Sequence, residues 1–108
     1  MSAPARWLYH ALLVADDLGD PYAPASLTKE GYLHASFAPT VEESTQLYFA
    51  KDAALVVFQI DPRRLTVAVD VVDTPRGPMP HLLGPLDRLA IVRRLARDEL
   101  EGLPDPIV

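Results

Sequence analysis

The chain has 108 residues, of which 49% are hydrophobic, and this is enough for one domain with a modest core. Its net charge of −5 argues against a protein that binds duplex nucleic acid, because contacts with the phosphates require a basic stripe. The absence of cysteine excludes disulfides and thiolate chemistry, and it is typical of a reducing cytoplasm. No apolar run has the roughly 18 residues of a membrane span, and residues 1–13 lack the layout of a signal peptide. We therefore expect a cytoplasmic protein with a single domain over residues 1–108.

The first half of the chain alternates between short strands and short helices. A strand is predicted over 6–14, followed by a loop, a short helix that Ser26 caps and Gly31 ends, and a second strand over 32–36. The next helix begins at Pro39 or Thr40, because Thr40 with Glu43 three residues later fits a capping box. Four apolar side chains are candidates for the buried side of this helix: Val41, Leu47, Tyr48 and Ala50.

The second half is richer in strand signals. Residues 54–60 form a continuous apolar run, which predicts a strand buried on both faces. A turn over 61–64 follows, then an alternating strand over 65–72, a loop over 74–78 and a rigid, proline-bracketed segment over 79–86. Residues 86–101 fit both a helix and an exposed edge strand. The 11 prolines are dispersed among loops, so we expect no linker and no second domain.

The chain has only three histidines, and each lies in a short, shaped context. They are His10, His34 and His81, and we expect them to line one ligand pocket. We expect no metal, because the close pairs typical of zinc sites, H-x-H or H-E-x-x-H, do not occur. Ser36 lies two residues after His34, so on a strand the two side chains share one face. A serine nucleophile would need a strained elbow, and no G-x-S-x-G is present.

Phosphate-binding chemistry has a weak signal in the sequence. Neither a P-loop nor a G-x-G-x-x-G is present. Four basic side chains are usually surface charges, yet each could anchor a phosphate beside the pocket: Lys29, Arg63, Arg64 and Arg76.

Five motifs, taken in order, resemble a bacterial family known as domain of unknown function 952. They are Tyr9-His10, the Tyr22 segment to residue 27, the Gly-Tyr-Leu-His-Ala-Ser of residues 31–36, the strand of residues 55–62, and Pro-His-x-x-Gly-Pro-Leu at residues 80–86. The resemblance covers nearly the whole chain. The second and last histidine motifs, with the strand between them, are together the specific part of it.

That family is grouped, more distantly, with the ADP-ribosyltransferase fold. The resemblance therefore implies an α+β fold of two small packed β-sheets with a few short helices and a cleft that holds NAD. It also favours a final strand over residues 90–97.

The RNA 2′-phosphotransferases of that fold carry a histidine on the first strand and His-x-Ser on the second, and His10 and His34-x-Ser36 are similar to them. The resemblance implies that His10 binds a ribose hydroxyl and that His34 and Ser36 contact the nicotinamide side or a phosphate. Tyr22 or Tyr32 would offer a face for stacking. His81 stands where related enzymes carry a glutamate.

Two functions remain open. The first is a transferase that acts with NAD, or on a phosphorylated nucleotide, with catalytic residues His10, His34 and His81. Its NAD or ADP-ribose-like ligand would contact His10, Tyr22, Tyr32, His34 and Ser36. The second is a non-catalytic module that keeps the cleft and binds a small molecule or a partner. Neither function requires a metal or a membrane.

Overall fold

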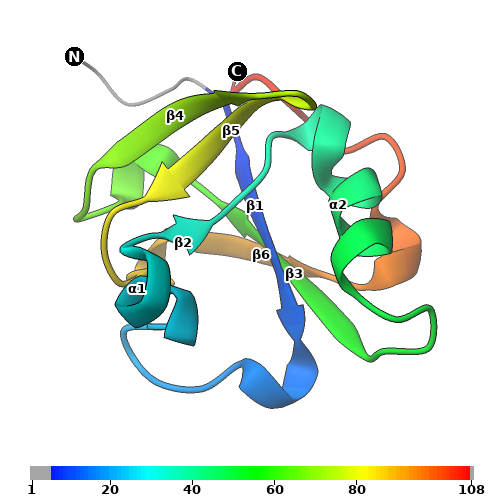
Figure 1. Cartoon of the computed structure of the whole chain (residues 1–108), viewed down its shortest axis with the longest axis horizontal. Coiled ribbons are helices and arrows are strands. Elements are labelled where there is room, and N and C mark those ends of the chain that lie inside the picture. Colours follow the sequence, from blue (N-terminus) through cyan, green and yellow to red (C-terminus); the bar gives the residue numbers. More distant parts are fainter. Residues whose placement is uncertain (1–5, 108) are drawn as a thin grey trace.

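The computed structural model describes residues 6–107, and strand β3 (Leu55–Ile60) is the centre of one of its sheets. It pairs antiparallel with β1 (Leu8–Leu13) on one side and with β6 (Ile91–Leu95) on the other. All residues of β3 except Val56 are buried, which confirms the predicted strand with both faces covered. In Figure 1 the strand β1, drawn in blue, runs down the centre of the view, in front of β3 and β6.

A second sheet has the order β2-β5-β4, so the described part of the chain holds two three-stranded antiparallel sheets. Strands β4 (Val69–Thr74) and β5 (Gly77–Leu82) form a hairpin, and β2 (Leu33–His34) pairs with the other edge of β5. Gly77 has a φ of +101°, a left-handed conformation that glycine adopts at little cost, and this allows the tight turn. This arrangement confirms the α+β class with two small sheets.

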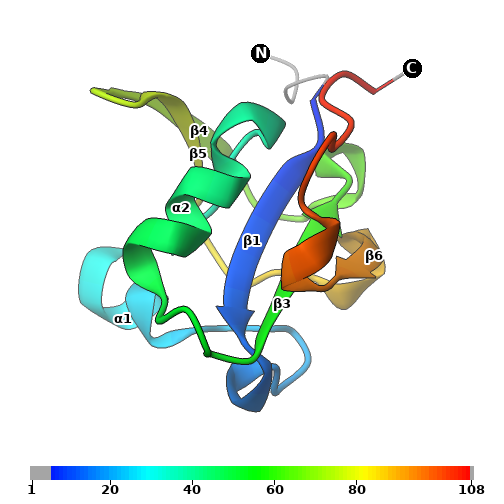
Figure 2. The same ribbon diagram turned by 90° about the vertical axis from the view of Figure 1, so that its right-hand side faces the viewer.

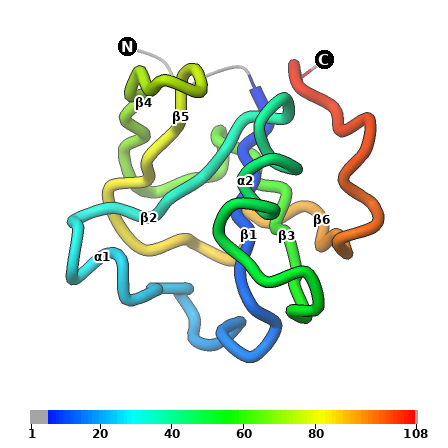
Figure 3. Tube along the Cα trace, turned by 45° about the vertical axis from the view of Figure 1, so that its right-hand side comes forward, coloured from blue at the N-terminus to red at the C-terminus, as the bar shows by residue number. Residues whose placement is uncertain are grey.

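The segment after β2 connects the two sheets. The amide of Ala35 donates to the carbonyl of Pro80 on β5 at 3.1 Å. One residue later, Ser36 exchanges two backbone hydrogen bonds with Tyr9 on β1, at 2.7 and 2.8 Å. Figure 3 traces this segment as it leaves α1, passes β5 and reaches β1. The relative position of the two sheets is therefore fixed by backbone pairing on both sides of a few residues.

The side chains of β1 alternate between two apolar clusters. Leu8 and Leu12 point into the larger cluster, where they meet Leu33, Phe58 and Leu82 from both sheets. The smaller cluster lies on the other face of the first sheet and contains Tyr9, Val41, Val57, Leu95 and Leu100. Helix α2 (Val41–Tyr48) contributes to this smaller cluster, and Figure 2 shows it on the same side of β1 as the β4–β5 hairpin.

Residues 6–107 contain two α-helices, both short, and no side chain caps the start of either. Helix α1 (Ala25–Glu30) begins directly after Pro24, so the prediction that Ser26 caps it is wrong. Its predicted end is confirmed, because Gly31 has a φ of +83° and its amide donates to the carbonyl of Leu27. In α2, Thr40 is the N-cap residue, but its hydroxyl donates to the carbonyl of Phe37 and no capping box forms.

The predicted buried side of α2 is confirmed for Val41 and is wrong for the other three residues. Val41 and Thr45, one turn apart, face the core, whereas Leu47 and Tyr48 are 60% and 69% exposed. Ala50 lies beyond the end of the helix and is also exposed. An eight-residue helix makes only about two turns, and here it buries one residue in each turn.

The C-terminal half contains more strand than the pattern predicts. Strand β4 begins at Val69 rather than at 65, and β5 occupies part of the predicted loop and the proline-bracketed segment. Proline rarely lies in a central strand because it has no amide hydrogen, but β5 pairs with only two residues of β2, so few hydrogen bonds are lost there. The ambiguous region contains β6, a strand as the family resemblance indicates. Among residues 6–107 no helix is long and apolar enough to cross a membrane.

The glycine of the Pro-His-x-x-Gly-Pro motif is required by packing. A Cβ atom on Gly84 would lie 2.6 Å from Cγ1 of Val67, and the backbone of Gly84 is not left-handed. We expect Gly84→Ala to lower the free energy of unfolding by about 1–3 kcal/mol through this overlap. Denaturant unfolding of Gly84→Ala, Val67→Ala and the double variant measures the effect. If the double variant is no more stable than additivity predicts, the contact with Val67 is not the cause.

Candidate functional site

A cavity of about 870 Å³ opens where residues 33–36 pass between β1, β5, α2 and the β4–β5 turn. This volume is in the range of small-molecule sites, roughly 300–1,000 Å³. All three histidines contribute to its lining, as do Tyr32 and Ser36, whereas Tyr22 does not. Eight polar side chains of the lining form two groups. We call Glu30, Tyr32, His34 and His81 the histidine cluster, and Ser36, Ser44, Tyr48 and Arg76 the arginine cluster.

The register of the second sheet builds the histidine cluster. His34 on β2 is the cross-strand partner of His81 on β5, and His81 is in turn opposite Asp70 on β4. Cross-strand partners project from the same face of a sheet, so the three side chains form a row. Tyr32 stacks on His81 with 3.9 Å between ring centroids and 8° between planes, and meets His34 edge-on at 4.8 Å.

Glu30 orients His34. Its carboxylate accepts hydrogen bonds from Nε2 of His34 at 3.1 Å and from the hydroxyl of Tyr32 at 3.2 Å. The N–H of His34 holds the pKa of Glu30 below its usual range. Because Nε2 carries the donated proton, Nδ1 of a neutral His34 is an acceptor, and no residue among 6–107 bonds to it.

His81 is the more enclosed of the two cluster histidines. Burial disfavours its imidazolium form and lowers its pKa, and the neighbouring His34 acts in the same direction. The carboxylates of Asp70 and Glu30 oppose this shift. A lowered pKa keeps His81 neutral at pH 7, and within residues 6–107 neither ring nitrogen has a hydrogen-bond partner. His81 can therefore both donate to and accept from a ligand.

His10 differs from the other two histidines because the protein uses both of its ring nitrogens. Nδ1 donates to the carbonyl oxygen of His34, and Nε2 accepts from the hydroxyl of Tyr22 at 3.0 Å. Burial lowers the pKa of His10 from 6.5 to about 4, so the ring is neutral, as this donor–acceptor pattern requires. Tyr22 is 3% exposed and packs edge-on against Phe58. Tyr22 thus lies in the larger apolar cluster, and His10 is held between it and the wall of the cavity.

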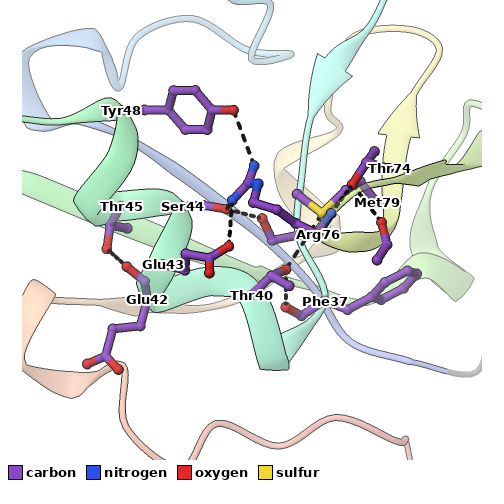
Figure 4. Close-up of polar contacts among 12 residues, drawn as sticks. Phe37, Thr40, Glu42, Glu43, Ser44, Thr45, Tyr48, Thr74, Arg76 and Met79 are labelled. Carbon is purple, nitrogen blue, oxygen red and sulfur yellow. Dashed lines mark hydrogen bonds and ion pairs between the residues drawn. The ribbon is translucent and has the colours of Figure 1, made fainter.

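The arginine cluster combines Ser36 with two residues of α2 and one of the β4–β5 turn. Nη1 of Arg76 donates to Glu43 and to the hydroxyl of Ser44, both at 3.1 Å, and Nη2 donates to the hydroxyl of Tyr48 at 3.2 Å (Figure 4). The hydroxyl of Ser44 is 3.3 Å from that of Ser36. Of the four basic residues named from the sequence, Arg76 alone lines the cavity within the described chain.

The other basic candidates lie elsewhere. Arg63 and Arg64 contact the buried carboxylate of Asp61, and Lys29 is exposed on α1 outside the lining. In residues 6–107 no group of three or more histidine, aspartate, glutamate or cysteine side chains is placed to hold a metal ion.

Sequence reasoning missed Glu30, Ser44 and Tyr48 as cavity residues. Glu30 carried a signal, because it directly precedes the glycine that ends α1, and that turn folds the chain back onto His34. Ser44 and Tyr48, one turn apart on α2, carried none, since their position depends on which face of α2 meets the hairpin.

Comparison with known proteins identifies the family. The model of the family "Protein of unknown function (DUF952)" matches residues 13–94, so the chain belongs to this family, as the motifs indicate. Protein CC0527 from Caulobacter crescentus has a similar crystal structure, with a TM-score of 0.74 and 21% identity over 83% of this chain and 84% of that one. A double mutant of that protein gives a TM-score of 0.73 at 20% identity over the same shares. These likenesses show the fold alone. No curated protein matches significantly.

The enclosed His10 makes stability depend on pH. Above pH 6.5 the ring is neutral in both the folded and the unfolded chain, and its full contribution to stability is present. As the pH falls below 6.5 the unfolded chain takes up a proton that the folded protein takes up only near pH 4. We expect the free energy of unfolding to drop by about 3 kcal/mol across this window, measured by urea unfolding.

The measurement is made in a His81→Asn background, because the pKa of His81 is also lowered. Unfolding free energies that stay constant between pH 6.5 and 4.5 would contradict the enclosed, neutral state of His10.

Tyr22→Phe should lower the free energy of unfolding at pH 7 by about 1–3 kcal/mol, since it leaves the acceptor nitrogen of His10 buried without a donor.

Proposed function

We propose that this member of the DUF952 family binds a pyridine nucleotide, NAD or an ADP-ribose-like molecule, in the cavity and acts as a transferase of the ADP-ribosyltransferase type. One observation carries the proposal. The Glu30–His34 pair adjoins the stacked rings of Tyr32 and His81, and all four side chains line one cavity of small-molecule size. The motif resemblance supports the same class of ligand.

The histidine cluster has the properties that a nicotinamide ring requires. Nicotinamide in NAD is a planar cation, which is attracted both to an aromatic face and to a carboxylate. Tyr32 and His81 supply the aromatic face, and Glu30 supplies an exposed carboxylate beside it. His81, neutral at pH 7, adds no positive charge that would repel the ring.

His34 is the proposed acid–base group. NAD would enter as the donor substrate and supply a ribosyl carbon whose bond to nicotinamide breaks. The hydroxyl oxygen of the acceptor substrate would bond to that carbon as nicotinamide leaves. His34 would accept the hydroxyl proton at Nδ1, while Glu30 stabilises the imidazolium that results. The related transferases carry a glutamate on a later strand where this chain has His81. In this chain Glu30 would be the carboxylate that faces the developing positive charge on the ribose.

A second candidate is a binding module without turnover, and the state of His10 favours it. The ribose contact that the resemblance assigns to His10 would require a ring nitrogen that already bonds to His34 or Tyr22. If nothing replaces that contact, the cavity binds its ligand without positioning the ribose for reaction.

Calorimetry with NAD, ADP-ribose and a 2′-phosphorylated RNA end tests the binding. We expect at least one of them to bind, and Tyr32→Leu to weaken binding about tenfold through the loss of the stacking face. Leu83→Ala is the control, since Leu83 follows β5 next to the cluster but does not line the cavity. If none of the three binds at millimolar concentration, the proposed function is wrong.

Chromatography of nicotinamide released from NAD separates the two candidates. A transferase should release nicotinamide, and His34→Asn should abolish the release while NAD still binds. Binding to the wild-type protein with no release would establish the module instead.

A further inference from the structure

We propose that the arginine cluster is a subsite for one phosphoryl group, the phosphate of a mononucleotide whose ring binds at the histidine cluster. The inference rests on the proposed function, because it assigns the second half of the same ligand. It names a substrate class, nicotinamide mononucleotide or the corresponding half of NAD.

Arg76 is the cation of this subsite. Among residues 6–107 no other lysine or arginine lines the cavity. Its planar guanidinium is held by three side chains, Glu43, Ser44 and Tyr48, and it lies over the ring of Tyr48 at 5.5 Å. A guanidinium fixed in this way presents several N–H groups in one plane, which is the geometry that phosphate oxygens prefer.

Hydroxyl protons complete the subsite. The hydroxyl of Tyr48 accepts from Arg76, so its own proton is free to donate to a ligand. Ser36 and Ser44 share a single hydrogen bond, which leaves one of their two protons free. Ser36 is 8% exposed and Ser44 is half-buried, so this donor lies inside the cavity rather than on the outer surface.

Glu43 does not block the subsite. Its side chain is 55% exposed, and an ion pair of this kind contributes little because water competes for both charges. The terminal phosphate of a mononucleotide is close to a dianion at pH 7 and carries more charge than a carboxylate, so it can replace Glu43 on the guanidinium. Glu43 then turns to solvent at little cost.

The spacing and the charges of the two clusters match one mononucleotide, either free or as half of NAD. Ser36 and His34 are two residues apart in an extended segment, about 7 Å, and a ribose can bridge that distance between a ring and a phosphate. One arginine balances one phosphoryl group, and the lining formed by residues 6–107 contains no glycine-rich loop that would hold a second. Glu30 at one cluster and Arg76 at the other match a molecule with a cationic ring and an anionic phosphate.

Calorimetry with nicotinamide mononucleotide and with nicotinamide riboside, which lacks the phosphate, tests the subsite. We expect the wild-type protein to bind the mononucleotide roughly ten- to a hundredfold more tightly than the riboside, as charge-assisted hydrogen bonds to one phosphate would provide. Arg76→Gln should reduce this ratio to near one and leave the riboside affinity unchanged. Arg64→Gln is the matched control, because Arg64 is an exposed arginine outside the cavity.

A purely structural role for Arg76, as a clamp between the β4–β5 turn and α2, gives a different result. Arg76→Gln would then lower the melting temperature and weaken both ligands equally, which would overturn the subsite. If Arg76→Gln does not fold, Ser44→Ala should still lower the ratio several-fold. A wild-type ratio near one overturns the subsite while the proposed function stands, whereas failure of both ligands and of NAD to bind overturns both.

Discussion

The enclosed imidazole of His10 is the constraint on which the rest of the structure depends. It comes from β1, donates to the carbonyl of His34 on β2 and accepts from Tyr22. Only a neutral histidine can do both, and burial keeps it neutral. Its bond to His34 lies two residues before the point where Ser36 pairs with Tyr9. Side-chain and backbone contacts therefore fix the same segment, residues 33–36, where it passes from one sheet to the other. Because residues 33–36 leave β5 to reach β1, a cavity opens between the two sheets and α2.

The three histidines therefore separate into two kinds. Both ring nitrogens of His10 are bonded within the protein, whereas Nδ1 of His34 and both ring nitrogens of His81 have no hydrogen-bond partner among residues 6–107. One backbone carbonyl links the two kinds. The carbonyl oxygen of His34 accepts the Nδ1–H of His10, while the side chain of the same residue faces the cavity. The cavity has a negative and a positive side chain on different elements. Glu30 comes from the end of α1 and Arg76 from the β4–β5 turn.

Much of the fold was predictable because its signals are local. The apolar run of β3, the glycine that ends α1 and the family motifs depend only on neighbouring residues. The convergence of His34 and His81 was a hypothesis that only the pairing of β2 with β5 could test. The exposure of Tyr48 and the burial of Tyr22 were not predictable, because each depends on how a helix or a loop packs on a distant sheet. Strand β5 was not predicted for a similar reason, because its prolines argue against a central strand. The sheet accepts them because β2 is short and pairs with only two residues of β5.

Nitrogen-15 NMR of the three histidine rings, with and without nicotinamide mononucleotide, tests the central claim most directly. The account predicts that His10 remains the neutral Nδ1–H tautomer from pH 5 to pH 8 and does not respond to the ligand, because both nitrogens are engaged. The signals of His34 and His81 should shift on binding. A His10 ring that titrates near its ordinary pKa, or that alone responds to the ligand, would contradict the account.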